Sequence, residues 1–404
     1  MSTEIRQLID YRNDRDASLK LIEWFDVERV RGARVLVIGA GAIGNEALKN
    51  LALLGIGHIF IVDRDSIEMS NLSRSVLFRA TDSGKDKVEV AARAVRELNP
   101  NVKTTYRKAD VTLDIGLGLL RRMDVVIGCL DNNQARLYIN RACWKVGKPW
   151  IDAGIGQLNG QVRVFIPGKG ACYECSFTEA QYEEIRIPCN LLASKYESEG
   201  KIPTTPTIAS IMGAVQVQEA LKLLDASRWE GRTLSGREFL FNGTVGEASV
   251  VSLPAKESCF AHTSLDLEKL VELESVTAQN TTAAELLALA RERLSDDAVI
   301  VLNYELCVEM RCPNCRDATR MLRPERKIFR EELLCARCGN DRYLVTTHTL
   351  GGSPTDYKED FLDTTLAALG VPALEILEAR GQNGVSVYLE LTGDAVSALS
   401  PTVE

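Results

Sequence analysis

A glycine-rich stretch and the acid that follows it have the residue types needed to bind a nucleotide. Gly39, Gly41 and Gly44 lie between the apolar run 34–38 and a helical pattern. Glycines there let the backbone approach phosphates, whose negative charge a helix N-terminus stabilises. Asp63 ends the next apolar run, 19 residues after Gly44, where such folds hold a ribose hydroxyl. These residues alone would also fit an NAD-dependent oxidoreductase, and no G-x-x-x-x-G-K-[ST] motif indicates a P-loop.

The segment DRDSIEMSNLSR, residues 63–74, adds an amide and a cation soon after that acid. Hydride transfer needs no cations around a triphosphate. Nucleotidyl transfer does, because charge develops on the α-phosphate and on the leaving pyrophosphate. The predicted nucleotide site therefore also includes the polar residues that follow the second and fourth strands, with Mg²⁺ on the last of them: Asp65, Asn71, Arg74, Lys87 and Asp131.

The spacing of the cysteines indicates metal sites in addition to the nucleotide site. Six of the eleven cysteines form C-x-x-C pairs, which in a reducing compartment favours zinc over disulfides. Cys312, Cys315, Cys335 and Cys338 have the spacing of a structural zinc ribbon. The third pair, Cys172 and Cys175, needs two more ligands from elsewhere in the chain.

Cys189 lies in a long polar stretch, 176–205, that contains no convincing strand. A connection of this length within a compact domain usually has a functional role, and a cysteine there is a candidate nucleophile. Cys129, Cys143 and Cys307 lie in apolar segments and are expected in the core.

The elements that would position these residues alternate between strand and helix. Strands are expected at 34–38, 58–63, 102–110, 124–130 and 149–155, with helices at 45–54, 85–98 and 133–146. This order predicts an α/β fold with a doubly wound, mostly parallel, Rossmann-like sheet. Further expectations are antiparallel strands at 160–167 and 237–254, a helix at 206–224, helical structure over 263–300, and a tail with a helix followed by a hairpin.

Length and charge limit the remaining classes. The 404 residues suggest two or three domains, and the net charge of −8 argues against a general nucleic-acid surface. No signal peptide and no apolar run long enough to cross a membrane are seen, so we expect a cytoplasmic protein. The expected units are an N-terminal helical segment (1–30), a nucleotide-binding domain (31–262) that includes the stretch 176–205, and a C-terminal α+β domain (263–404) with the zinc ribbon at 308–345.

Five motifs in order resemble one known family: RVLVIGAGAIG, VDRDSIEMSNLSRSVLFR, GKDKVEVAA, DVVIGCLDNNQAR and CYEC. Over roughly residues 10–262 they are similar to the adenylation domain shared by ubiquitin-activating enzymes and the molybdopterin- and thiamine-pathway adenylyltransferases of the ThiF, MoeB and HesA type. The resemblance implies an enzyme that uses ATP and Mg²⁺ to adenylate the C-terminal glycine of a ubiquitin-like protein.

The family pattern also implies roles for individual residues. Asp63 would bind the ribose, Asn71, Arg74 and Lys87 the phosphates, and Asp131 the Mg²⁺. Arg12 and Arg15 match paired N-terminal arginines, of which the second reaches the ATP site of a partner subunit, so a homodimer is implied. Where relatives have a second C-x-x-C, this chain reads CFAH. Cys259 and His262 would therefore complete a zinc site with Cys172 and Cys175.

Cys189 matches a crossover-loop cysteine of the family, which leaves two outcomes open within this class of enzyme. It would accept the activated glycine as a thioester before a conjugating enzyme acts, as in ubiquitin-activating relatives. Alternatively, the enzyme stops at the adenylate of a ubiquitin-fold sulfur carrier. The remaining alternatives are the oxidoreductase and a zinc-ribbon binding module on an inactive adenylation domain.

Overall fold

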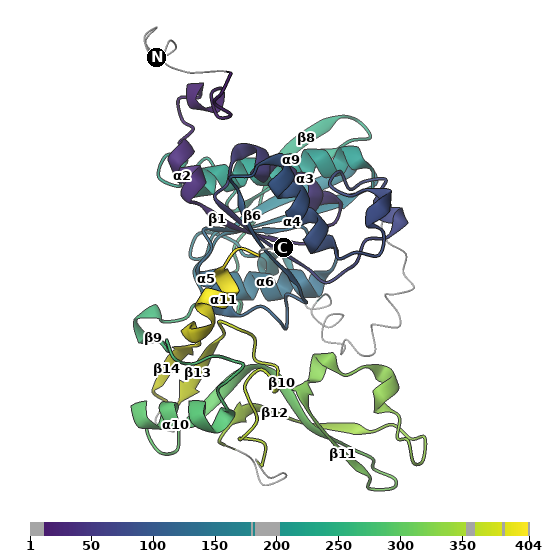
Figure 1. Ribbon diagram of the computed structural model, residues 1–404, viewed down its shortest axis with the longest axis vertical. Helices are drawn as coiled ribbons and strands as arrows, with labels where there is room; N and C mark the ends of the chain where they lie inside the picture. The colour runs from purple at the N-terminus through teal and green to yellow at the C-terminus, as the bar shows by residue number, and fades with distance from the viewer. Residues whose placement is uncertain (1–11, 179–180, 182–202, 353–359, 382–383, 403–404) are drawn as a thin grey trace.

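The structure, a computed structural model, describes residues 12–178, 181, 203–352, 360–381 and 384–402. Two β-sheets organise this part of the chain, one above the other in Figure 1. No described helix is both long and apolar enough to cross a membrane. Between residue 12 and the first strand, the described chain forms a short 3-10 turn, Leu19–Leu21, and the helix α2, Val27–Gly32.

The first sheet has eight strands in the order β3-β2-β1-β4-β5-β6-β7-β8. Strands β1 to β5 are parallel and β6 to β8 antiparallel. Their bounds are β1 Arg34–Ile38, β2 His58–Asp63, β3 Lys103–Lys108, β4 Val125–Gly128, β5 Trp150–Gly156, β6 Asn159–Phe165, β7 Arg237–Asn242 and β8 Glu247–Ser252. This confirms the doubly wound, mostly parallel fold predicted from the alternating pattern.

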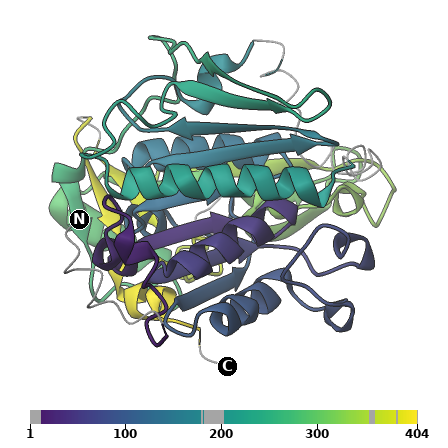
Figure 2. The same ribbon diagram turned by 90° about the horizontal axis from the view of Figure 1, so that it is seen from above.

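Helices cover both faces of this sheet. On one face lie α3 Ala42–Leu54, α4 Lys87–Leu98 and α9 Pro206–Leu224, which Figure 2 shows side by side. On the other lie α5 Leu117–Arg121 and α6 Asn133–Lys145. Strand β1 has β2 on one side and β4 on the other, so the chain reverses its winding there. In open α/β sheets, ligands bind at the carboxyl ends of the strands at such a switch point.

The second sheet runs β11-β10-β13-β14-β9, with β12 also paired to β10. Its elements are β9 Leu270–Glu272, β10 Val299–Arg311, β11 Ala318–Pro324, β12 Tyr343–Leu350, β13 Ile376–Arg380 and β14 Ser386–Glu390, with the helices α10 Ala283–Arg293 and α11 Ala395–Leu399. Residues 306–347, from the far half of β10 through β11 to β12, extend away from the rest of this sheet (Figure 1) and are called the zinc arm below.

The two sheets share a hydrophobic core. Helix α5 has only five residues, and Leu374 and Ile376 join it in the buried cluster that also contains Leu36 and Phe60 of the first sheet. A Cβ on Gly118 would overlap the Leu374 carbonyl oxygen, so a glycine is needed for this close approach. Arg121, the last residue of α5, and Arg122, its C-cap, pair with the fully buried Glu390 of β14. The chain then returns to the first sheet, where the Thr402 N–H donates to the Thr104 carbonyl of β3 at 2.9 Å.

Three expectations for the elements were wrong in part. Residues 237–254 form a hairpin rather than one strand, reversing at Gly246, whose φ is +74°. Of residues 263–300, only α10 and a short 3-10 turn are helical, and residues 270–272 instead form β9, which pairs with β14. No helix precedes the final hairpin within the described residues of the tail. There Leu366 and Leu369 enter the core from turns, and Gly370, with φ +97°, changes the chain direction.

Candidate nucleotide and zinc sites

The glycine turn joins β1 to α3 at the switch point. Gly39 has φ +95°, and a Cβ there would overlap the Cys129 carbonyl oxygen. A Cβ on Gly44 would overlap the carbonyl oxygen of Gly39. Gly41, the N-cap of α3, differs from both, because a Cβ there would meet no atom within 4 Å. Gly39 and Gly44 are therefore needed for packing, and Gly41 faces open space that a phosphate can approach.

Asp63, at the end of β2, is tied to the same turn. Its Oδ2 accepts from the Ala40 N–H at 2.7 Å and its Oδ1 from the Asp65 N–H at 2.8 Å. Burial raises the pKa of Asp63 above its ordinary value, and the nearby Lys87 opposes that shift. The carboxylate is thus fixed beside the glycine turn, where a ribose hydroxyl can bond to it.

The predicted phosphate ligands are held by local hydrogen bonds. Lys87, at the start of α4, is largely buried, and its Nζ lies 2.8 Å from Asp65 Oδ2. The Lys87 N–H also donates to the Asp65 carbonyl at 3.1 Å, which brings α4 against the segment after β2. Asn71 is buried and accepts from the Glu68 N–H at 3.0 Å. Arg74 donates to the Ser70 carbonyl at 2.9 Å and remains partly exposed.

Asp131 emerges from the neighbouring strand. The end of β4 pairs with the end of β1, Gly128 opposite Ile38, so the segment after β4 begins beside the glycine turn. Asn132 caps α6 by accepting from the Ala135 N–H at 2.8 Å, while the Asp131 side chain is exposed. An exposed carboxylate at this edge is the hard oxygen ligand that Mg²⁺ prefers.

A buried charge network next to Asp131 was not predicted from the sequence. Asp152 of β5 is fully buried and pairs with Arg136 Nε at 2.9 Å and Arg163 Nη2 at 2.6 Å. Arg136 also donates to the Leu130 carbonyl, the peptide just before Asp131. The only sequence signal is an aspartate inside the apolar strand WIDAGIG, which must be paired if it is buried.

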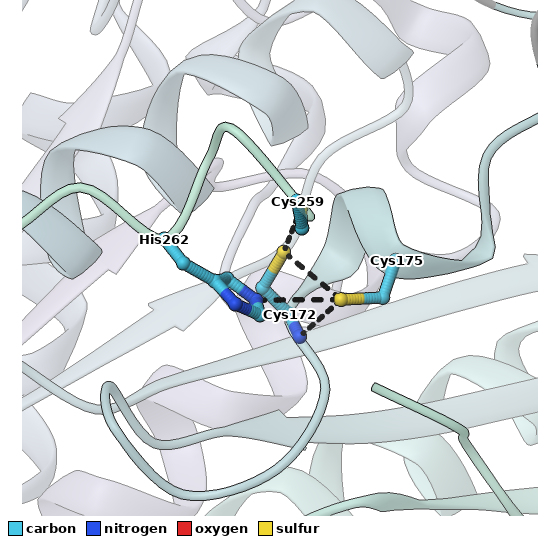
Figure 3. A group of neighbouring side chains, drawn as sticks. All are labelled: Cys172, Cys175, Cys259 and His262. Atoms are coloured by element: carbon cyan, nitrogen blue, oxygen red, sulfur yellow. Dashed lines mark hydrogen bonds between the residues drawn. The ribbon is translucent and has the colours of Figure 1, made fainter. Parts of the chain in front are cut away.

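The first cysteine cluster has the geometry of a tetrahedral metal site (Figure 3). The Sγ atom of Cys172 lies 3.7 Å from the Sγ of Cys175 and 3.6 Å from the Sγ of Cys259. The Nε2 atom of His262 lies 3.3 Å from the Sγ of Cys175. Ligands about 2.3 Å from a tetrahedral zinc are separated by about 3.8 Å, so the spacing fits. The His262 ring stacks on Trp144 of α6, with centroids 4.2 Å apart, which fixes its orientation.

The second cluster lies on the zinc arm. Cys312 Sγ is 3.4 Å from Cys338 Sγ, and Cys315 Sγ is 3.6 Å from Cys335 Sγ. All four ligand atoms of each cluster lie within 4.8 Å of one another. Four thiolates at these distances form a closed structural set, with no position left for a substrate.

The other residues singled out in the sequence are Cys189, Arg15 and the cysteines expected in the core. Cys189 lies outside the described residues. Arg15 donates to the Leu98 carbonyl at the end of α4, by the amino ends of the strands and so away from this chain's own glycine turn. Cys143 and Cys307 are buried as predicted, and burial raises the pKa of Cys307 to about 12. Cys129 is only partly buried.

The sequence and the fold are both similar to those of known proteins. Residues 13–261 match the model of the ThiF family. The adenylyltransferase and sulfurtransferase MOCS3 of Bos taurus is 30% identical over 71% of this chain and 60% of its own length. The ubiquitin-like modifier-activating enzyme 5 of Dictyostelium discoideum is 31% identical over 49% and 54%. The chain thus spans little more than half the length of these two relatives. The crystal structure of E. coli MccB with succinimide has 22% identity and a TM-score of 0.52, covering 62% of this chain and 74% of that one, which shows a similar fold.

Proposed function

The chain belongs to the ThiF family, and on that premise we propose that it uses ATP to adenylate the C-terminal glycine of a ubiquitin-like protein. One observation supports this most directly. A glycine turn, a ribose-side acid, a buried lysine and an exposed carboxylate meet at one switch point of a parallel sheet. An oxidoreductase would use the first two and would have no need for the others.

In the proposed reaction, the glycine carboxylate attacks the α-phosphorus of ATP. The bond to the β-phosphate breaks, and pyrophosphate leaves with its electron pair. Lys87 would exchange part of its contact with Asp65 for phosphate oxygens, and Arg74 and Asn71 would bind the same group from the segment after β2. Asp131 would hold Mg²⁺, which neutralises phosphate charge when bound.

The buried network gives Asp131 a fixed position in this scheme. Arg136 is held by Asp152 and bonds the Leu130 carbonyl, so the peptide before Asp131 cannot move freely. A fixed carboxylate needs little reorganisation as charge develops in the transition state. We therefore assign Arg136 and Asp152 a positioning role.

Cys189 would take the acyl group in a second step. Its thiolate would attack the acyl carbon of the adenylate, forming a thioester and releasing AMP. The alternative is an enzyme that stops at the adenylate of a sulfur carrier. Arg15 would act at the ATP site of a second copy, because it lies far from its own. The two cysteine clusters would each hold one structural Zn²⁺.

ATP–pyrophosphate exchange tests this proposal. The enzyme should exchange labelled pyrophosphate into ATP only when a ubiquitin-fold protein ending in Gly-Gly is present. Deleting the last glycine of that protein should abolish the exchange. NAD reduction without exchange would instead favour the oxidoreductase, and exchange with no protein added would rule out the glycine carboxylate as acceptor.

A further inference from the structure

The zinc arm exposes apolar side chains close to a residue that is buried in its small core. Two 3-10 turns, Glu325–Lys327 and Arg330–Leu333, connect β11 to the second cysteine pair. Ile328, between them, is buried and packs with Cys307 and Met310. Phe329 and Leu334, at the two ends of the second turn, are 65% and 54% exposed. The segment is thus anchored by one apolar residue while two others stay in solvent.

The two turns and the cysteine loop that follows them carry arginines without acidic partners. Arg326, Arg330 and Arg337 are exposed, and none makes an ion pair with any described residue. Their neighbours differ, because Arg323 pairs with Glu332 and Lys327 with Asp114. In a protein of net charge −8, exposed guanidinium groups without ion pairs alternate with exposed apolar side chains along residues 326–337, which makes this segment an unusual part of the surface. We call it the arm patch: Arg326, Phe329, Arg330, Leu334 and Arg337.

The arm patch lies near the nucleotide site. Lys327, between Arg326 and Phe329 along the chain, places its Nζ 2.7 Å from Asp114 Oδ1. Asp114 belongs to the segment that follows β3 at the carboxyl edge of the first sheet, and it accepts from the Asp110 N–H at 2.9 Å. Asp110 in turn pairs with Arg64, the residue after Asp63. The arm therefore contacts the same edge at which the nucleotide would bind.

The shared core keeps the arm in this place. Leu374, just before β13, and Ile376 of β13 belong to the same buried cluster as residues of the first sheet, and Glu390 is buried against Arg121 and Arg122. Breaking a buried pair of this kind costs several kcal/mol, so the two sheets should move as one body. A protein bound to the arm patch would then be held at a constant distance from the adenylation site.

We propose that the arm patch docks the folded part of the ubiquitin-like protein whose C-terminal glycine is adenylated. This inference rests on the proposed function. An apolar anchor flanked by arginines is typical of interface hot spots, and the unpaired charges favour a partner with an acidic surface near its tail. Nucleic acid fits less well, because Glu331 is exposed next to Arg330 and would repel phosphates.

Two double variants test the docking site: Phe329→Ala with Leu334→Ala, and Arg326→Glu with Arg330→Glu. The probe is a recombinant ubiquitin-fold protein ending in Gly-Gly, the first of a panel to support ATP–pyrophosphate exchange by the wild-type enzyme. Each variant should raise the KM for this probe about tenfold or more, as loss of a hot spot does. The kcat at saturating probe and the KM for ATP should not change. The charge variant should also weaken the salt dependence of the probe's KM.

Matched controls change exposed residues of the helices α11 and α10, outside the arm patch: Val396→Ala and Arg293→Glu. They should leave the KM for the probe unaltered, and all variants should keep the wild-type zinc content. Exchange with an unchanged KM in both arm variants would overturn the docking site and leave the proposed function standing. No exchange by the wild type with any panel member would remove the proposed function and the docking site together. Binding of a single-stranded RNA that only the charge variant loses, with KM unchanged, would make the arm a nucleic-acid site.

Discussion

At the scale of single residues, the predicted nucleotide site contains side chains that are already hydrogen-bonded and one carboxylate that is free to bind a cation. Asp63 and Lys87 are largely buried and already bonded, to Ala40 and Asp65 respectively. Asp131 is exposed, and its one described hydrogen bond, from Asn132, is 3.3 Å long. An available carboxylate beside a preformed turn is what a bound cation requires.

Asp131→Ala should therefore lower ATP–pyrophosphate exchange at least about 100-fold, because phosphate charge would no longer be neutralised by a held cation. The melting temperature should stay within about 1 °C of the wild type, since exposed side chains contribute little to stability. Asp297→Ala, which changes another exposed acid, is the matched control. Undiminished exchange in Asp131→Ala would remove this residue from the mechanism.

Cys189→Ser should keep ATP–pyrophosphate exchange but lose a thiol-sensitive adduct with the ubiquitin-like protein. The serine hydroxyl is a far weaker nucleophile than a thiolate at neutral pH. Non-reducing gels with and without added thiol measure the adduct. Survival of the adduct in the variant would assign the nucleophile to another cysteine, and its absence in the wild type would favour the sulfur-carrier alternative.

At the scale of elements, both cysteine clusters hold segments that little else supports. The arm's small core consists of Cys307, Met310 and Ile328, with three partly buried neighbours. The other cluster joins the segment after β6 to the segment after β8, and among the described residues it packs, beyond its own cysteines, on Trp144, Ala171, Leu253 and Ala261. Metal binding would supply folding free energy that these small cores cannot.

Metal analysis of the purified protein should give two zinc ions per chain. Cys335→Ser should remove one and His262→Ala the other, and the double variant both. Because the arm folds around its metal, Cys335→Ser should also make residues 312–342 sensitive to limited proteolysis. A single equivalent in the wild type, unaltered by His262→Ala, would show that the Cys₃His cluster binds no zinc.

At the scale of the whole molecule, a buried carboxylate lies where the two sheets meet. Glu375 accepts from the backbone N–H groups of Leu117 and Ile376, at 3.2 and 2.8 Å. Burial raises its pKa to about 7, although those hydrogen bonds and the nearby Lys145 and Asn303 oppose the shift. Burial likewise lowers the pKa of Lys145. The folded interface thus favours the neutral acid.

Glu375 should make the contact between the sheets weaker at higher pH. A pKa raised in the folded state adds stability below pH about 4.5 that is lost as the pH rises through about 7. Glu375→Gln mimics the neutral acid, so its unfolding free energy should rise relative to the wild type between pH 5 and 8, by up to about 3 kcal/mol. Urea unfolding across this range measures the difference.

His58 also titrates with a shifted pKa, but it does not affect the comparison of Glu375→Gln with the wild type. Its pKa is lowered to about 4 by burial, so its own effect has the opposite sign, with stability lost as the pH falls through about 4. Both proteins contain His58, and its effect cancels in the comparison. A difference between Glu375→Gln and the wild type that does not vary with pH would contradict a raised pKa for Glu375.

The sequence by itself determined the parallel sheet, and it supplied the residues of the nucleotide site as a prediction. Apolar runs such as 34–38 and 58–63 became β1 and β2 with the predicted bounds, because local periodicity and glycine or acid punctuation specify these elements directly. The spacing of Cys312 to Cys338 similarly predicted a cluster that the structure brings together. These are short-range signals, carried by neighbouring residues.

Only the tertiary structure decided features that depend on distant partners. Asp152 is neutralised by Arg136 and Arg163, and nothing in WIDAGIG reveals which cations approach it. Residues 270–272 became a strand because β14, more than 100 positions later, offers unpaired backbone groups. The packing of Leu374 under the first sheet fixes the zinc arm beside the nucleotide site. Contacts between residues far apart in the chain depend on three-dimensional packing, which no local pattern encodes.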